Sequence, residues 1–164
     1  MSPHAPAAPA ATLALERLPG HQIRRLQQIA VAIFLQETEG LGVTPVQYAA
    51  LQAVANEPEI DQRTLAARIG FDTSTIGGVV DRLEARGLLR RQVAPHDRRA
   101  RQLHLTDEGA ARLAQVQPAM LAAQERMMAP LTPADRSTFL ALLDRLVEAN
   151  NELSRAPSAA AGLD

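Results

Sequence analysis

The segment between Asp61 and Thr106 constrains the fold of this 164-residue chain more than any other. Asp61 precedes the short helical pattern QRTLAARI, which Gly70 closes, and Asp72 or Thr73 then opens a second helical pattern. Small polar residues are favoured at helix N-caps and glycine just beyond the last turn, so both helices have marked ends. Two short stretches, LLRRQV and RQLHLT, follow as strands on either side of a turn predicted at residues 95–99. The segment is therefore predicted to fold as helix, tight turn, helix and hairpin.

Helical periodicity accounts for most of the remaining chain. Four further helices are predicted over residues 21–39, 45–56, 106–128 and 132–153. Pro118 lies inside the third of these and is expected to kink or split it. The last helix has six residues that we expect to be buried: Phe139, Leu140, Leu142, Leu143, Leu146 and Val147. Because aromatic residues make up only 2% of the chain, aliphatic side chains must fill the core, which favours helices packed on helices. The predicted fold class is mainly α with a small β-hairpin wing.

Positive charge is concentrated in the middle of a chain whose net charge is only −1. Residues 63–101 contain nine arginines and four acidic residues, which gives +5 for this segment and −6 for the rest. All 17 basic residues are arginine, whose planar guanidinium suits phosphate oxygens and guanine edges. A basic centre with acidic ends is typical of a protein that binds nucleic acid with one part only. The alternative is a solvated surface on which the arginines cluster by chance.

The composition excludes several classes of function. The chain has no cysteine, so it has no disulfide, thiol nucleophile or thiolate metal site. It has no run of about 18 apolar residues, so no membrane span is predicted. Its four histidines are scattered, and it has no zinc-protease motif, glycine-rich phosphate loop or serine-centred nucleophile elbow. We therefore predict that the protein is not an enzyme, needs no metal or cofactor and, lacking a basic leader sequence, is cytoplasmic.

This order of elements is typical of a winged helix-turn-helix. Such a unit places its second helix in the major groove of DNA and reads bases with the N-terminal residues of that helix. A basic hairpin beside it can reach the neighbouring minor groove, where arginine is favoured. Double-stranded DNA is therefore the predicted partner. The alternative is a winged helix that serves as a protein–protein interaction module without DNA binding, and the concentrated charge of the hairpin argues against it.

Two adjacent glycines, Gly77 and Gly78, are unusual inside the predicted second helix. Each costs about 1 kcal/mol relative to alanine in a helix interior. They either let the helix backbone approach DNA or the preceding helix closely, or they are a defect that tertiary packing tolerates. The apolar face of this helix is predicted to consist of Ile76, Val79, Val80 and Leu83, at the spacing of a buried stripe.

Four stretches resemble the MarR family of winged helix-turn-helix regulators: LGVTPVQYAAL, LAARIGFDTSTIGGVVDRLEARGLLRR, DRRARQLHLTDEGA and LTPADRSTFLALLDRL. The most specific element is D-R-L-E-x-x-G-L-[LIV]-x-R, followed by D-x-R and then by L-T-x-x-G. The resemblance covers residues 13–153 and implies a homodimer. It assigns a dimerisation helix to residues 13–43, the DNA-binding region to 44–105 and further dimerisation helices to 106–153. The ends, residues 1–12 and 154–164, are predicted to be disordered tails.

The resemblance also implies which residues contact DNA. Asp97 would orient Arg99 at the minor groove, while Arg98 and Arg101 contact phosphates. The residues predicted to form the DNA site are Thr73, Ser74, Thr75, Gly78, Arg82, Asp97, Arg98, Arg99 and Arg101. The alternative for Arg82 is an ion pair on its own helix, but no residue three or four positions away is acidic.

Members of the family commonly bind small aromatic or phenolic acids between the dimer helices and the DNA-binding lobes. The ligand shifts the lobes so that they no longer match half-sites one helical turn apart. A cleft for such an acid needs a cation, a hydrogen-bond donor and a flat apolar wall. The residues predicted to supply these are His21, Arg24, Arg25, Gln47 and Tyr48. The alternative is that the two arginines are solvated or paired at an interface and that Tyr48 belongs to the core.

Within the family, the stretch HQIRRLQQIAVAIF resembles regulators of the breakdown of nicotinate and related aromatic acids. The absence of cysteine argues against the branch that senses hydroperoxides with a reactive thiol. Taken together, the sequence predicts a dimeric repressor on pseudo-palindromic operator DNA. We expect a small aromatic carboxylate or phenolic effector to release it from the DNA.

Overall fold

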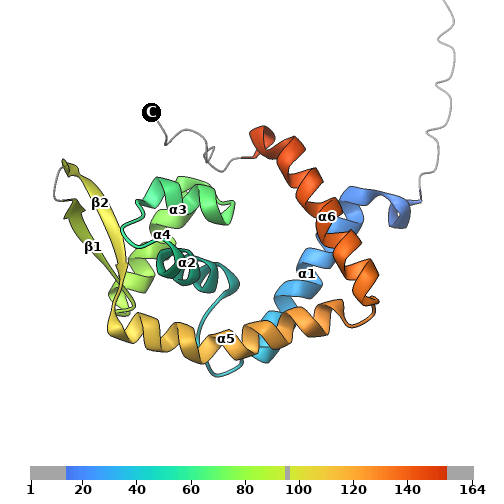
Figure 1. Ribbon diagram of the computed structural model, residues 1–164, viewed down its shortest axis with the longest axis horizontal. Coiled ribbons are helices and arrows are strands. Elements are labelled where there is room, and N and C mark those ends of the chain that lie inside the picture. The colour runs from blue at the N-terminus through green and yellow to red at the C-terminus, as the bar shows by residue number, and fades with distance from the viewer. Residues whose placement is uncertain (1–13, 95–96, 155–164) are drawn as a thin grey trace, which may run out of the picture.

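The computed structural model describes residues 14–94 and 97–154, with the backbone alone at residues 97–100. In this part of the chain the elements are η1 (Leu15–Arg17), α1 (Pro19–Glu37), α2 (Pro45–Asn56), α3 (Gln62–Ile69), α4 (Thr73–Ala85), β1 (Leu89–Ala94), β2 (Asp97–Leu105), α5 (Asp107–Met128), α6 (Pro133–Asn150) and η2 (Asn151–Leu153). Figure 1 shows the long helix α5 along one edge of the molecule, connecting two parts. We refer to α2, α3, α4, β1 and β2 as the winged lobe; α1 and α6 extend from the other end of α5. The predicted fold class is confirmed.

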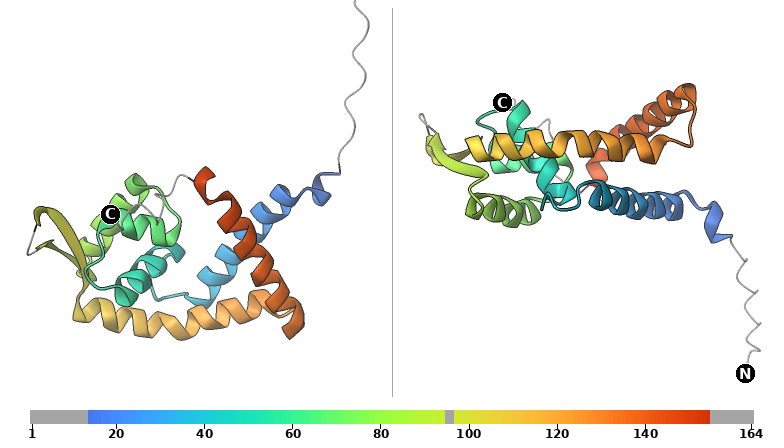
Figure 2. Two further views of the ribbon diagram at one scale, coloured as in Figure 1. Left: turned by 45° about the horizontal axis from the view of Figure 1, so that its top comes forward. Right: turned by 90° about the horizontal axis from the view of Figure 1, so that it is seen from below.

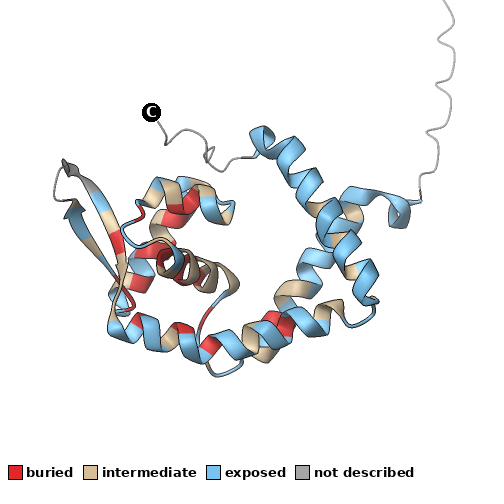
Figure 3. Cartoon of the chain, viewed as in Figure 1, coloured by how far each residue is buried: buried red, intermediate tan, exposed pale blue. Residues whose placement is uncertain are grey.

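The buried core lies in the winged lobe and where this lobe meets the first half of α5 (Figure 3). The apolar stripe predicted for α4 is confirmed, with at most 1% exposure at Ile76, Val79, Val80 and Leu83. These residues share one cluster with Leu51 of α2, Leu65 of α3 and Leu103 of β2. Full burial of one such side chain contributes about 1.5–3 kcal/mol, so this cluster fixes the orientation of α4.

Side-chain caps mark the starts of α2 to α6, including those predicted at Asp61 and Asp72. Thr44 and Gln47 form a capping box at the start of α2. Four further N-caps accept the backbone N–H three residues on, namely Asp61, Asp72, Thr106 and Thr132. Gly70 ends α3 with a φ of 72°, in the left-handed region that favours glycine. The boundaries of the two helices of the helix-turn-helix are therefore set by local chemistry.

Prolines bear on two of the predicted helices. α1 begins at Pro19 rather than near His21, because proline fits the first turn of a helix, where its missing N–H is not needed. α5 is not split at Pro118. The carbonyl of Ala114 loses its usual N–H partner there, but both residues are exposed, so water can take the place of that partner.

The strand β2 begins earlier than predicted, at Asp97. β1 and β2 are antiparallel, and Ala94 pairs with Asp97, whereas Val93 pairs with Arg101, so the register is irregular at this point. Because the ladder extends to the Ala94–Asp97 pair, residues 97–99 belong to a strand. The prediction that placed them in the turn was wrong.

The predicted burial of α6 is wrong for the single chain. Leu140, Leu142, Leu146 and Val147 are 49–63% exposed, and Phe139 and Leu143 are only partly buried. α6 crosses α1 in Figure 1, but the right-hand view of Figure 2 shows that the two helices stand apart. α6 therefore has the apolar sequence of a packed helix, with little of the described chain packed against it.

Gly109 lies in the first turn of α5, where a Cβ atom would be 1.9 Å from the carbonyl oxygen of Leu88. Gly109→Ala therefore forces the backbone to move, and overpacking of this kind costs about 1–3 kcal/mol. We expect a lower midpoint of denaturant unfolding, followed by circular dichroism. Gly20→Ala in the first turn of α1 is the control, because nothing lies within 4 Å of its Cβ position. An unchanged midpoint for Gly109→Ala would contradict this account.

Candidate DNA interface and small-molecule cavity

The N-terminal end of α4 is exposed and rich in hydroxyl groups. Asp72 accepts the hydroxyls of Ser74 and Thr75 at 2.5 and 2.6 Å and the backbone N–H of Thr75 at 2.8 Å. These bonds, the Ser74 hydroxyl first among them, hold the pKa of Asp72 well below its usual range. Thr73, Ser74 and Thr75 are all exposed. The tip of α4 therefore presents hydroxyl groups, two of which are ordered by an ionised carboxylate.

Further along α4, its exposed face carries Gly78 and Arg82. The guanidinium of Arg82 lies back along the helix, since a Cβ on Gly78 would be 3.5 Å from its Nη1. Within residues 14–94 and 97–154, the exposed side chain of Arg82 makes no hydrogen bond or ion pair. A Cβ on Gly77 would instead be 3.3 Å from Nε2 of Gln62 in α3. Gly77 therefore allows a close approach of the preceding helix, and Gly78 leaves the exposed face open beside Arg82.

The base of the hairpin is joined to the start of α3 by backbone bonds. The N–H of Leu103 donates to the carbonyl of Ile60 at 2.9 Å, and its carbonyl accepts the N–H of Glu59 at 3.2 Å. Asp61, the N-cap of α3, also forms an isolated bridge with Gln102 of β2. The hairpin and the helix-turn-helix are therefore built as one lobe.

The predicted wing residues lie on β2. Asp97, Arg98 and Arg99 belong to this strand, but their side chains lie outside the described residues, so the orientation of Arg99 by Asp97 stays a prediction. Arg101 is exposed on the same strand. All four residues therefore lie in the half of β2 that is farther from its buried base at Leu103.

The described arginines of the basic segment divide into two groups. Arg68, Arg86, Arg91 and Arg101 interact with other groups of the chain. Three others are exposed and have no hydrogen-bond or ion-pair partner in the described ranges: Arg63 of α3, Arg82 of α4 and Arg90 of β1. The charge that remains for a partner is therefore smaller than the sequence total.

Two arginines from different helices bond to the connection between α1 and α2. Arg86, at the C-terminal end of α4, donates from Nη1 to the carbonyl oxygen of Gly42 at 2.8 Å and to Oε1 of Gln47 at 3.4 Å. Arg112 of α5 donates to the carbonyl oxygen of Leu41 at 3.0 Å. These contacts fix the segment that leads from α1 into the winged lobe.

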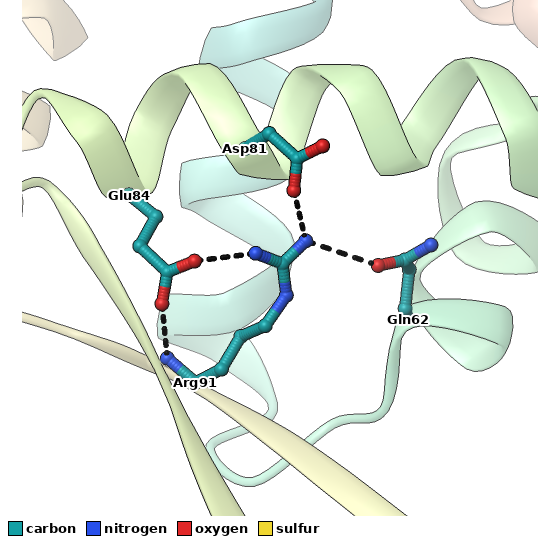
Figure 4. Close-up of polar contacts among 4 residues, drawn as sticks. All are labelled: Gln62, Asp81, Glu84 and Arg91. Atoms are coloured by element: carbon teal, nitrogen blue, oxygen red, sulfur yellow. Dashed lines mark hydrogen bonds and ion pairs between the residues drawn. The ribbon is translucent and has the colours of Figure 1, made fainter.

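Arg91 of β1 lies within a cluster of polar side chains (Figure 4). Its guanidinium pairs with Asp81 at 2.6 Å and with Glu84, and it reaches Oε1 of Gln62 at 3.4 Å. Its backbone N–H donates to Glu84 at 3.1 Å. Burial alone would lower the pKa of Arg91, but the two carboxylates more than offset burial and raise it. Asp81, Glu84 and Arg91 are the acidic residues and the last arginine of the D-R-L-E-x-x-G-L-[LIV]-x-R motif, to which sequence analysis assigned no role.

A cavity of about 530 Å³ opens beside α2. Its aromatic wall is Phe34 and Tyr48, whose ring centroids are 6.2 Å apart at an angle of 57°. The Tyr48 hydroxyl donates to Gln52 at 3.2 Å, and burial raises the pKa of Tyr48. Asn56 and Arg68 add an amide and a cation to the lining. The cavity thus combines an aromatic wall, a hydrogen-bond donor and a cation.

Of the residues predicted to bind an effector, the structure places Tyr48 in the cavity lining. Gln47 is 7% exposed, and its Oε1 accepts hydrogen bonds from the backbone N–H of Thr44, at the start of α2, and from Arg86. It therefore does not line the cavity. His21, Arg24 and Arg25 lie on α1 and outside the lining, with both arginines exposed. Sequence reasoning missed Arg68, which no local pattern distinguishes from the other exposed arginines.

No group of three or more His, Asp or Glu side chains in the described ranges is placed to hold a metal ion. No helix in this part of the chain is both long and apolar enough to cross a membrane. In the described ranges, the groups that could bind a partner are the hydroxyls and arginines of the winged lobe and the polar side chains that line the cavity.

A helix-turn-helix joined to a hairpin defines a winged-helix protein, and the solvent-exposed arginine on its second helix is suited to DNA. The MarR family model matches residues 41–100. A protein of Thauera aromatica described as a regulator of the hcr operon is 38% identical over 134 residues, which is 81% of each chain. The repressor NicR of Pseudomonas putida is 32% identical over 80% of this chain and 83% of its own. The chain belongs to the MarR family of transcriptional regulators, as its motifs predict.

Solved structures show the same fold. PcaV of Streptomyces coelicolor with its natural ligand has a TM-score of 0.80 and 37% identity over 85% of this chain and 98% of its own. BpsR of Bordetella bronchiseptica, whose DNA binding is regulated by 6-hydroxynicotinic acid, has a TM-score of 0.79 and 29% identity over 83% and 97%. CouR bound to a 23-mer DNA duplex has a TM-score of 0.76 and 29% identity over 81% and 94%. The chain is therefore a DNA-binding regulator, and the curated relatives named above are described as regulators, not as enzymes.

Proposed function

We propose that the chain acts as a dimeric repressor that binds pseudo-palindromic operator DNA and releases it when a small aromatic acid binds. The observation that carries the DNA-binding part is the exposed face of α4, where Arg82 has no partner in the described chain. The similarity to DNA-bound CouR supports it. The similarity to PcaV and BpsR supports the effector part.

The tip of α4 is suited to the major groove. Recognition helices contact base edges mainly with their N-terminal residues, and Thr73, Ser74 and Thr75 are exposed at this end. Gly78 has no side chain to hold the helix away from DNA. Arg82 can donate to a guanine edge or a phosphate without breaking an internal bond, because it makes none with the described residues.

The outer half of the hairpin is suited to the adjoining minor groove. In this proposal Asp97 orients Arg99 into the groove, while Arg98 and Arg101 contact phosphates. A narrow minor groove has a strongly negative potential, which favours arginine. The hairpin and α4 belong to one lobe, so the two groove contacts form together.

Arg82→Ala and Arg99→Ala are each expected to weaken binding to DNA from upstream of the protein's own gene. Loss of a base contact at Arg82 costs about 1–3 kcal/mol and relaxes sequence preference, whereas Arg99→Ala removes the wing contact. Fluorescence anisotropy titrations measure both. Arg145→Ala, which removes an exposed arginine of α6, is the control, and sedimentation velocity verifies that this variant stays dimeric.

Salt separates DNA binding from the alternative of a protein–protein module. With about 6–10 phosphate contacts, affinity falls by about 10³–10⁵ between 50 and 200 mM salt. Unchanged affinity in both variants, together with a flat salt dependence, would remove the DNA-docking proposal in favour of the module.

The dimer in this proposal is supported by apolar residues that the single chain leaves in water. Most of the large exposed apolar residues lie on or beside α1 and α6, among them Ile23, Ile29, Leu142 and Leu146. Exposed apolar surface of this kind marks interaction sites in soluble proteins. We therefore propose that residues 13–43 and 106–153 pair two copies of the chain.

Leu142→Glu/Leu146→Glu is expected to convert the dimer to a monomer, because two charges would be buried at the interface. Sedimentation velocity measures the change in mass. Val93→Glu is the control: Val93 is 49% exposed, but it lies on the hairpin, so this variant should stay dimeric. A double variant that sediments as the unmodified chain does would rule out α6 as the interface.

The cavity beside α2 is the proposed effector site. Its aromatic wall suits a planar ring, and the Tyr48 hydroxyl and Gln52 can bond to ring substituents. Arg68 uses Nε for its pair with Glu57 at 3.0 Å, which leaves its two terminal nitrogens for a carboxylate. His21, Arg24 and Arg25 remain the sequence-based alternative for the charged contact.

A thermal-shift titration with aromatic carboxylates, including 6-hydroxynicotinic acid, tests this site. A ligand at 100 times its Kd stabilises the protein by about 2.7 kcal/mol. We expect Arg68→Ala to abolish the shift and Arg63→Ala, an exposed arginine on the same helix, to retain it. Loss of the shift in Arg24→Ala or Arg25→Ala, with Arg68→Ala unaffected, would assign the charged contact to α1 instead.

A further inference from the structure

Arg91 lies where three elements of the winged lobe meet. Its side chain extends from β1 to Asp81 and Glu84 on α4 and to Gln62 on α3 (Figure 4). Both terminal nitrogens of the guanidinium bond to carboxylates, and 24% of the side chain is exposed. Arg91 therefore cannot reach DNA without giving up two charged partners, unlike Arg82.

Because Arg91 lies near the base of the hairpin, its contacts can set the direction in which the hairpin projects from α4. Only Gly87 and Leu88 separate the C-cap of α4 from β1, and Gly87 turns the chain with a φ of 69°. Leu88 and Leu89 are buried and fix the base of the hairpin, whereas Val93 is 49% exposed. Beyond Arg91, three more residues of β1 extend outward by about 3.3 Å each. A small change of angle at Arg91 is therefore enlarged at the far end of the hairpin.

We propose that Arg91 is a positioning residue for DNA binding, which holds the hairpin at a fixed angle to α4 so that both reach their grooves together. This inference rests on the proposed function. Arginine suits the role because its planar fork bonds two carboxylates at once, which fixes direction as well as distance. The lysine ammonium has three donors but no planar fork, so it would fix the direction of the two carboxylates less well.

The acidic charges of the cluster allow a positioning role to be distinguished from a purely electrostatic effect on the affinity for DNA. Asp81 and Glu84 lie on the helix proposed to enter the groove, so removing their charges should strengthen DNA binding if charge alone matters. If the two carboxylates serve to hold Arg91, removing them should weaken binding, because the hairpin loses its fixed angle.

The first experiment compares the unmodified chain with Asp81→Ala/Glu84→Ala in titrations of the operator DNA. The inference predicts weaker binding by about tenfold, comparable to the loss of one hydrogen bond to a charged group. Glu59→Gln is the control, because it removes an exposed charge of the same lobe that has no part in the cluster. Tighter binding by the double variant would overturn the inference. Failure of the unmodified chain to bind would overturn the proposed function itself.

The second experiment is a double-mutant cycle between Arg91 and Arg99. If Arg91 acts through the hairpin, Arg91→Met should weaken binding about tenfold in the unmodified chain but less than about twofold once Arg99→Ala has removed the wing contact. In an Arg82→Ala background the full effect should persist, and Arg91→Lys should lie between methionine and arginine. Equal losses in the Arg99→Ala and unmodified backgrounds would overturn the inference. Circular dichroism verifies that each variant folds. If Arg91→Met does not fold, the Asp81→Ala/Glu84→Ala variant still tests the inference.

Discussion

The burial of one face of α4 is the constraint on which the rest of the structure depends. Ile76, Val79 and Leu83 are removed from water, and the helix cannot rotate about its axis without exposing them. At about 1.5–3 kcal/mol for each such side chain, rotation is too costly to occur in the native state. The opposite face, with Gly78 and Arg82, is therefore held toward solvent. In this way the buried apolar core, which itself contacts no partner, determines which polar side chains of α4 are exposed to one.

Arginines of the same segment take different roles according to what faces them. Arg82 faces solvent, while Arg91, nine positions on, faces two carboxylates. The sequence total of +5 for residues 63–101 counts both, so it predicts the presence of a basic surface but not its members. Arg86 is a further case: it belongs to the basic segment by sequence and to the connection between α1 and α2 by structure.

Features that depend on neighbours within one helical turn were predicted well. The caps at Asp61 and Asp72 and the left-handed Gly70 are of this kind. Contacts between distant parts of the chain were not predicted. For example, nothing near Gly109 in the sequence shows that its α-carbon faces the carbonyl of Leu88. The apolar pattern of α6 indicated a buried face, but a sequence does not say whether the covering surface belongs to the same chain. The cavity brings Tyr48, which the sequence predicted for an effector site, next to Arg68, which it did not name, because the two residues belong to different helices.

The link between α1 and the winged lobe is anchored through its main chain. Arg86 and Arg112 donate to the carbonyl oxygens of Gly42 and Leu41, and every amino acid supplies such an oxygen. The two bonds are thus indifferent to the side chains of the residues that supply these oxygens. Within the link, the φ of 78° at Gly40, the φ of 64° at Gly42 and the burial of Val43 restrict substitution. Substitutions at the positions that supply only a carbonyl oxygen, such as Leu41, can accordingly leave the geometry of this joint unchanged.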